Sequence, residues 1–252
     1  MKNKVFYNLI PVFSVAAAFI LWFIAARIAN SPLVLPSPKE VFKEFFSSLG
    51  SKNLYVALGF TVIRTAECFL ISLIFGAFFG YLKYKYPAFE RAVYPFSAFL
   101  RTVPTMSVIL ILLVFVNSSA VPVCVAFLIV LPLVSATVKS ALSSLDGKIF
   151  EMAAVYGVKK SKIITAYALP AAFGNSYSSL LSELSLSFKV VISAEVISDA
   201  INSMGRIMAQ SKYDLETGKL FAYTLICVAA SVIFETAVKL IARAVLKRRS
   251  RK

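Results

Sequence analysis

The chain has 252 residues, of which 59% are hydrophobic and only 15% are charged, and its net charge is +15. About a quarter of the residues of a soluble domain are charged, so this composition predicts an integral membrane protein, expected as a single domain over residues 1–252. Lys and Arg gather at the ends of apolar segments, which is typical of membrane flanks and disfavours nucleic-acid binding. The chain has no histidine and no phosphate-binding P-loop string. Histidine metal sites and Ser-His-Asp triads are therefore excluded, and if ATP drives this protein, another chain binds it.

Apolar segments in chain order predict an all-α fold with about six transmembrane helices. We expect the first helix to stay uncleaved, because Arg27 interrupts its only region that resembles a signal-peptidase site. Pro36 to Pro38 mark the start of a short amphipathic helix. The charge-free stretch 102–138 is too long for one helix, and Asn117-Ser118-Ser119 predicts a turn inside it. The expected spans are 8–28, 56–82, 94–116, 121–140, 177–197 and 220–241.

Basic residues are distributed unevenly between the two sides of this six-span arrangement. Sixteen Lys and Arg fall on the side of the two termini, seven on the opposite side and four within spans. Cytoplasmic loops carry the excess of positive charge in membrane proteins. The count therefore predicts cytoplasmic termini, and it places the segment 141–170 in the cytoplasm as well.

That segment contains Glu151, Ala153 and Gly157, followed by Leu169 and Pro170. The spacing resembles the EAA loop of permease subunits of ATP-binding cassette (ABC) importers, and it implies a type I importer permease fold. Two positions depart from the pattern: Met152 replaces the usual second Ala, and Tyr167 stands where an Ile is common.

The resemblance implies that residues 141–170 form a cytoplasmic coupling loop. Within the loop, a short helix from Phe150 to Val158 would dock on an ATPase. Glu151 would offer a charge to the ATPase surface, Ala153 and Ala154 would keep the helix slim, and Gly157 would permit a tight turn. A plain amphipathic interfacial helix is the alternative interpretation of this stretch.

Three further segments resemble permeases of the nitrate, sulfonate and taurine importer group, whose relatives also move pyrimidine vitamin precursors. They are Val34–Val41, Arg101–Thr105, and Ser193–Ile197 followed by Met204-Gly205. Phe115-Val116-Asn117 departs from the group, since many relatives have an aromatic residue followed by Gly there.

The implied function is that of a permease subunit which performs no catalysis, needs no cofactor and moves a small solute across the inner membrane by alternating access. The implied partners are two ABC ATPase subunits, a second, identical permease subunit, an extracytoplasmic binding protein and membrane lipid.

Charged residues inside spans are costly and therefore suggest function. The residues that we consider for the solute pathway or a gate are Arg101, Pro104, Lys189 and Glu195. By their spacing on a helix, Arg64 is expected to neutralise Glu67, and Glu235 to neutralise Lys239. Gly76 and Gly80 form a GxxxG pattern, which we expect to pack against another helix of the same chain.

Two other functions fit a membrane protein of this size. An ion-coupled secondary transporter would use the embedded charges, but the chain shows no repeated halves. An enzyme acting on lipids would need a clustered catalytic motif, which the sequence lacks. The importer permease is therefore our hypothesis, and the secondary transporter is its main alternative.

Overall fold

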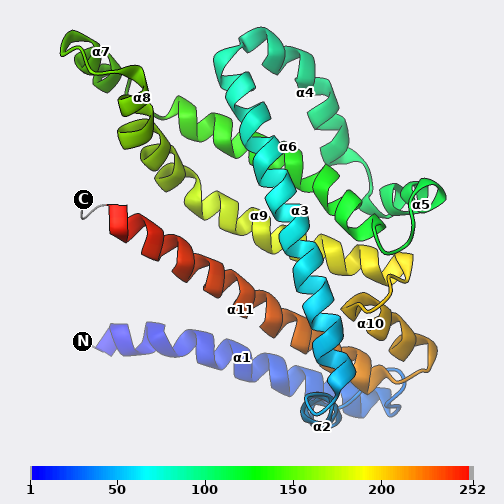
Figure 1. The fold of residues 1–252 in the computed structure, drawn as a ribbon. Helices are drawn as coiled ribbons and strands as arrows, with labels where there is room; N and C mark the ends of the chain where they lie inside the picture. The colour runs from blue at the N-terminus through cyan, green and yellow to red at the C-terminus, as the bar shows by residue number, and fades with distance from the viewer. Residues whose placement is uncertain (1, 250–252) are drawn as a thin grey trace.

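The computed structural model describes the backbone of residues 2–249 and the side chains of residues 13–242, and all regular elements in this part of the chain are helical (Figure 1). The elements are α1 (Lys2–Ala29), α2 (Pro38–Ser48), α3 (Lys52–Lys85), α4 (Pro87–Thr102), α5 (Thr105–Phe115), α6 (Val121–Ser143), α7 (Gly147–Val155), α8 (Lys160–Ile163), the π-helical turn η1 (Ile164–Ala168), α9 (Leu169–Ser198), α10 (Met204–Tyr213) and α11 (Thr217–Arg249).

Three helices are long and apolar enough to cross a membrane: α3, α6 and the Thr217–Ala242 part of α11. The bent pair α4 and α5 makes a fourth if the two helices form one broken span. The all-α membrane fold is therefore confirmed. The count of six stays a prediction, because the described side chains of α1 cover only the apolar stretch Phe13–Ala29, and α9 is long but is not among the helices that are apolar enough to span.

The expected third span over 94–116 is not one straight helix. Helices α4 and α5 divide this range, and their axes meet at an angle of 99°. The break falls at Val103 and Pro104, where Val103 is extended with φ −65° and ψ 130°. A proline disfavours helical geometry in the residue before it and has no N–H to donate, so the helix ends here and α5 begins after Pro104. The turn expected at Asn117-Ser118-Ser119 does separate α5 from α6.

The centre of the molecule is formed by α3, α6 and α9, which pack against one another. Gly76 and Gly80 of α3 face α6, as expected for packing within the chain. A Cβ on Gly76 would lie 2.5 Å from Cγ1 of Val134, and a Cβ on Gly80 would lie 2.8 Å from the backbone oxygen of Ser135. The two glycines therefore allow the backbones of α3 and α6 to approach closely.

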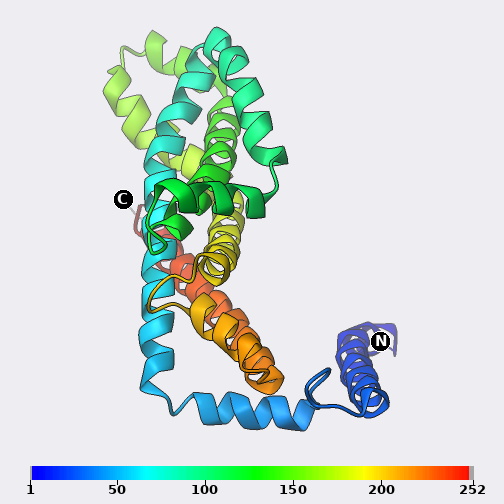
Figure 2. The same ribbon diagram turned by 90° about the vertical axis from the view of Figure 1, so that its right-hand side faces the viewer.

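The expected short amphipathic helix is α2, and it joins α1 to the rest of the chain. Ser37 caps α2 in a reciprocal capping box with Glu40. Figure 2 shows α1 standing apart from the central helices, with the loop at its C-terminal end leading to α2. There the indole of Trp22 donates to the backbone oxygen of Pro36 at 3.1 Å and stacks on Phe221 of α11.

Helix α9 begins at Leu169, earlier than the expected start of the fifth span at residue 177. Pro170 lies in its first turn, where a missing N–H costs nothing. Helices α7 and α8 lie at the same side of Figure 1 as the marked ends of the chain, whereas α2, α5 and α10 lie at the other. The arrangement of the elements therefore agrees with the two groups of loops used in the charge count.

Candidate functional sites

The predicted coupling loop is a short helix with a defined stop. Asp146 caps the start of α7, since its carboxylate accepts from the N–H of Lys148 at 2.9 Å. At the other end, Val158 N–H donates to Ala153 O at 2.9 Å and Gly157 N–H donates to Ala154 O at 3.1 Å. This pair of bonds is a Schellman motif with Gly157 in the left-handed conformation at φ +67°. The motif explains why a glycine stands four residues after Ala153.

Tyr167, which departs from the family pattern, ties the loop to the helix that follows. Its hydroxyl accepts from the backbone N–H of Asp146 at 3.2 Å, and its ring meets Phe150 edge-on with centroids 5.7 Å apart. Tyr167 lies in η1, directly before α9. Tyr167 therefore links the start of α7 to the turn directly before α9 through both a hydrogen bond and a ring contact.

The end of α7 exposes apolar side chains in a basic surrounding. Val155 is 85% exposed, Tyr156 79% and Met152 56%, and the carboxylate-bearing Glu151 is exposed beside them. Lysines precede and follow this exposed tip, at positions 148, 159, 160 and 162. Leu169 and Pro170 lie apart from the tip, in the first turn of α9. We call Met152, Val155 and Tyr156 the loop tip.

A buried ion pair joins α3 to α9. Arg64 Nη1 lies 2.9 Å from Oε1 of Glu195, and the Glu195 side chain is fully buried. Thr61 donates to both carboxylate oxygens at 3.1 and 2.8 Å, and Gly205 N–H of α10 donates to Oε2 at 3.3 Å. Arg64 Nη2 also donates to the backbone oxygen of Ile201 at 2.8 Å. The group therefore fixes α3, α9 and the N-terminus of α10 together, and we call it the Glu195 clamp.

The clamp corrects the partner expected for Arg64. Spacing on the helix suggested Glu67, but the guanidinium pairs with Glu195 and Glu67 is exposed. The clamp also explains why the Ser193–Ile197 and Met204-Gly205 segments occur together in the sequence pattern, since Glu195 accepts from Gly205. Sequence reasoning missed Thr61 and the Arg64 link, although the opposite charges embedded in two spans were a usable signal.

Arg101 and Pro104 lie where α4 gives way to α5. Arg101 is exposed and donates to the backbone oxygen of Pro132 in α6 at 3.2 Å. On the neighbouring α9, Glu183 is buried and accepts from Thr137 of α6 at 2.6 Å. The other oxygen of Glu183 has no hydrogen-bond partner among the described residues. The sequence analysis did not predict this contact between Thr137 and Glu183.

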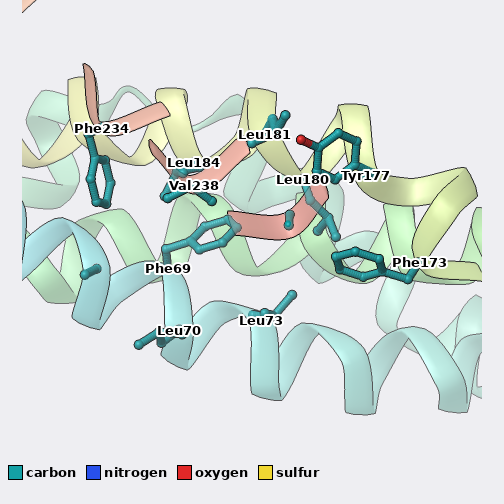
Figure 3. A pocket seen from close by; sticks show the side chains of 12 residues that line it. Phe69, Leu70, Leu73, Phe173, Tyr177, Leu180, Leu181, Leu184, Phe234 and Val238 are labelled. Carbon is teal, nitrogen blue, oxygen red and sulfur yellow. The ribbon is translucent and has the colours of Figure 1, made fainter. Parts of the chain in front are cut away.

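An apolar cavity of about 350 Å³ lies between α3, α9 and α11 (Figure 3). Figure 3 shows Phe69 and Leu73 of α3 on one side of it and Leu180 and Leu184 of α9 on the other. The hydroxyl of Tyr177 donates to the backbone oxygen of Lys239. A polar solute would find almost no hydrogen-bonding group here, so this cavity is unsuited to its passage.

Lys189 lies on the opposite, open side of α9. It is exposed and lines a cavity of about 450 Å³ with Ser185, Ser193 and Glu235. Glu235 of α11 accepts from Ser185 at 2.5 Å. It forms no ion pair with Lys239 among the described side chains, so the pairing expected from their spacing is wrong. Lys189 and Glu195 thus belong to separate sites, one open and one sealed.

Comparison with known proteins agrees with this geometry. Residues 72–250 match the family described as the binding-protein-dependent transport system inner membrane component. SsuC of Bacillus subtilis strain 168, whose name refers to aliphatic sulfonate transport, is 25% identical over 222 residues, which cover 87% of this chain and 80% of SsuC.

Two solved structures share the fold. An inward-facing form of the MetNI methionine ABC transporter matches with a TM-score of 0.62 and 16% identity, over 77% of this chain and 94% of that chain. A bacterial ABC transporter that imports alginate matches with a TM-score of 0.61 and 13% identity, over 97% of this chain and 98% of that chain. The family match covers most of the chain, so this protein belongs to the inner membrane component family of binding-protein-dependent transport systems, the permeases of ABC importers.

Proposed function

We propose that this permease moves a small solute inward by alternating access, and that a separate ATPase drives it through the loop tip. The family supports ATPase and substrate-binding partners in general. Two ATPase subunits, a second identical permease chain and an extracytoplasmic binding protein would complete the importer. Both termini and α7 would then lie in the cytoplasm, as the distribution of Lys and Arg predicts.

The observation that carries the proposal is the loop tip itself. Three apolar side chains stand exposed there, and on a loop that faces the cytoplasm, as proposed, they would gain nothing from lipid. The Schellman motif fixes the end of their helix, and Tyr167 connects it to α9. A partner with an apolar groove and an acidic rim would bury the tip and pair with the surrounding lysines. Movement of that partner would be transmitted to α9.

The residues proposed for the pathway have different roles. Glu195 is sealed inside its clamp, so we assign it to holding the outer ends of α3, α9 and α10 together. Arg101 and Pro104 sit at the bend between α4 and α5, where a change of angle would alter the packing of α5 on α9. Of the four candidate pathway residues, Lys189 is the one that lies exposed on the open face of a long helix, α9.

For the solute we propose a small organic anion of the sulfonate type. The support is the 25% identity to SsuC together with the sequence segments that resemble the nitrate, sulfonate and taurine group. Such a solute would be delivered by the binding protein, because the outer turn at Asn117–Ala120 is too short to form a capture site by itself.

The docking role is tested with Tyr156→Asp in the complete importer. Tyr156 is 79% exposed at the loop tip, and Tyr213, at the end of α10, is also 79% exposed. Tyr213→Asp is therefore a matched control at the opposite side of the molecule. We expect Tyr156→Asp to reduce the ATPase that co-purifies with the tagged permease by about tenfold or more, and Tyr213→Asp to leave it unchanged.

Uptake of a labelled alkanesulfonate into cells gives the second measurement. It should fall with the loss of ATPase for Tyr156→Asp. Normal ATPase recovery together with normal uptake in this variant would contradict docking at the loop tip. Loss of ATPase in both variants would show instead that the substitutions act through folding.

A further inference from the structure

Helix α9 carries a row of exposed polar side chains on its open face, interrupted between Ser182 and Lys189. Its 30 residues contact α3, α5, α6, α10 and α11, and the residues on the contacting side are buried, Leu184 and Val191 among them. Each residue of an α-helix is rotated by about 100° from the one before it, and by this measure the exposed polar residues of α9 fall within an arc of about 100° around the helix axis. They are Asn175, Ser178, Ser179, Ser182, Lys189 and Ser193. We call these six residues the α9 stripe.

Exposure of the α9 stripe to lipid would be energetically unfavourable. Each polar group in hydrocarbon costs free energy, and a lysine near the middle of a span costs most. Helix α9 is long enough to span but is not among the helices that are apolar enough to cross a membrane, and Lys189 of the stripe is one of the three charged residues that it carries with Glu183 and Glu195. The stripe must therefore face either water or a second protein surface.

The cavities beside α9 differ according to side. The cavity that α9 shares with α6 is lined by Thr137, Ser140 and Asn175, and the one that it shares with α11 contains Lys189 and Glu235. The cavity toward α3, on the far side of α9, is apolar (Figure 3). Polar side chains thus lie in both cavities at the open face of α9, in the second one beside apolar residues such as Ile192 and Val228, whereas the lining of the cavity toward α3 is apolar apart from Tyr177.

Lys189 is the only charged residue on the stripe. Its ammonium group makes no ion pair or hydrogen bond with the described side chains. Glu235 lies in the same cavity but accepts from Ser185 and is partly buried. The serine hydroxyls of the stripe are largely occupied with their own helix: Ser182 donates to Ser178 O, and Ser193 donates to Lys189 O. The ammonium is thus the strongest free group that the stripe offers.

We propose that the α9 stripe is a wall of the water-filled solute path and that Lys189 is the residue that selects solutes by charge, favouring those with an anionic group. This inference deepens the proposed function by assigning its preference for anions to one side chain. Lys189 would attract an anion into the path and repel a cation, while the serines would offer a neutral, hydrated surface to the rest of the solute.

Water access is tested by cysteine labelling in membranes that contain the complete importer. Cys68, Cys124 and Cys227 are first replaced by Ala, and Ser182→Cys or Ser193→Cys is then introduced. Ile233→Cys is the matched control, because Ile233 of α11 is 69% exposed but has an apolar side chain. We expect charged, membrane-impermeant methanethiosulfonates to modify the two stripe positions and to leave position 233 unmodified.

Charge selection is tested with two reagents of similar size and opposite charge, sulfonatoethyl and trimethylammonioethyl methanethiosulfonate. At Ser193→Cys, one turn from Lys189, the anionic reagent should be favoured relative to its rate with a free thiol. Replacing Lys189 by Gln should lower the ratio of anionic to cationic rates by about five- to thirtyfold, depending on the effective dielectric constant of the path. Lys189→Arg should keep the ratio, and Lys189→Glu should invert it.

Two results would overturn the proposal. Unmodified cysteines at 182 and 193 would mean that the stripe is a dry contact between protein surfaces. If the cysteines are modified but Lys189→Gln leaves the ratio of anionic to cationic rates unchanged, the path contains water but Lys189 does not select solutes by charge. Neither result depends on the ATPase-docking test with Tyr156, so failure here can be told apart from failure of the proposed function.

Discussion

Gly205 lies so close to Glu195 that a Cβ at position 205 would stand 2.4 Å from the Cβ of Glu195 and 2.4 Å from the backbone N of Val196. The N-terminus of α10 thus rests directly on the backbone of α9. This approach lets the N–H of Gly205 reach the buried carboxylate at 3.3 Å.

Gly205→Ala should therefore separate α10 from α9 and lower the free energy of unfolding by about 1–3 kcal/mol. Gly174→Ala is the control within α9, since a Cβ there meets nothing within 4 Å. Thermal unfolding of the purified protein in detergent measures both variants. An unchanged melting temperature for Gly205→Ala would mean that the two helices can move apart at little cost.

The ion pair of the Glu195 clamp should show strong coupling between its two members. Arg64→Leu leaves a buried carboxylate without its cation, and Glu195→Leu leaves a buried guanidinium, so each single variant should lose about 3–5 kcal/mol of stability. The double variant Arg64→Leu/Glu195→Leu removes both charges and should be more stable than either single variant. Additive losses in this double-mutant cycle would contradict a direct pairing.

The close crossing of α3 and α6 predicts a position-dependent effect of alanine within one helix. Gly76→Ala places a Cβ 2.5 Å from Val134 and should destabilise the protein by about 1–3 kcal/mol. Gly59→Ala in the same helix has open space around the new methyl group and should be neutral or slightly stabilising. Equal melting temperatures for the two variants would argue against the observed packing.

The left-handed conformation of Gly157 predicts which substitutions at this position will be tolerated and which will not. Gly157→Val should disfavour the Schellman motif, because a β-branched residue at φ +67° is strained, and it should reduce both ATPase recovery and uptake. Gly157→Asn should retain most activity, because Asn tolerates this conformation. Similar activity in both variants would show that coupling does not need the turn.

The sidedness of the loops predicts opposite labelling of two exposed positions. Ser161→Cys, beside the loop tip, should react with an impermeant thiol reagent only from the cytoplasm, and Asp214→Cys, after α10, only from outside. Both are made in the background without native cysteines and measured in right-side-out and inverted vesicles. Labelling of position 161 from outside would remove the loop tip from reach of any ATPase.

The sequence alone determined the class of this protein. Its low charge and long apolar segments predicted a membrane protein, and the spacing of Glu151, Gly157 and Pro170 carried the resemblance to importer permeases, the family that the comparison confirms. These features are local, so periodicity and spacing were sufficient to find them. Pro104, also local, marked the bend that the expected span over 94–116 ignored.

Only the tertiary structure decided which distant side chains meet. Arg64 and Glu195 are 131 residues apart, and the sequence offered Glu67 as a nearer partner for the arginine. The choice follows from how α3 and α9 rotate to bury their faces, which depends on close contacts such as those of Gly76 with Val134 and of Gly205 with Glu195. The same rotations left Lys189 on the open face of α9. The spacing of side chains within one helix does not predict these contacts, because they form only when the helices pack together.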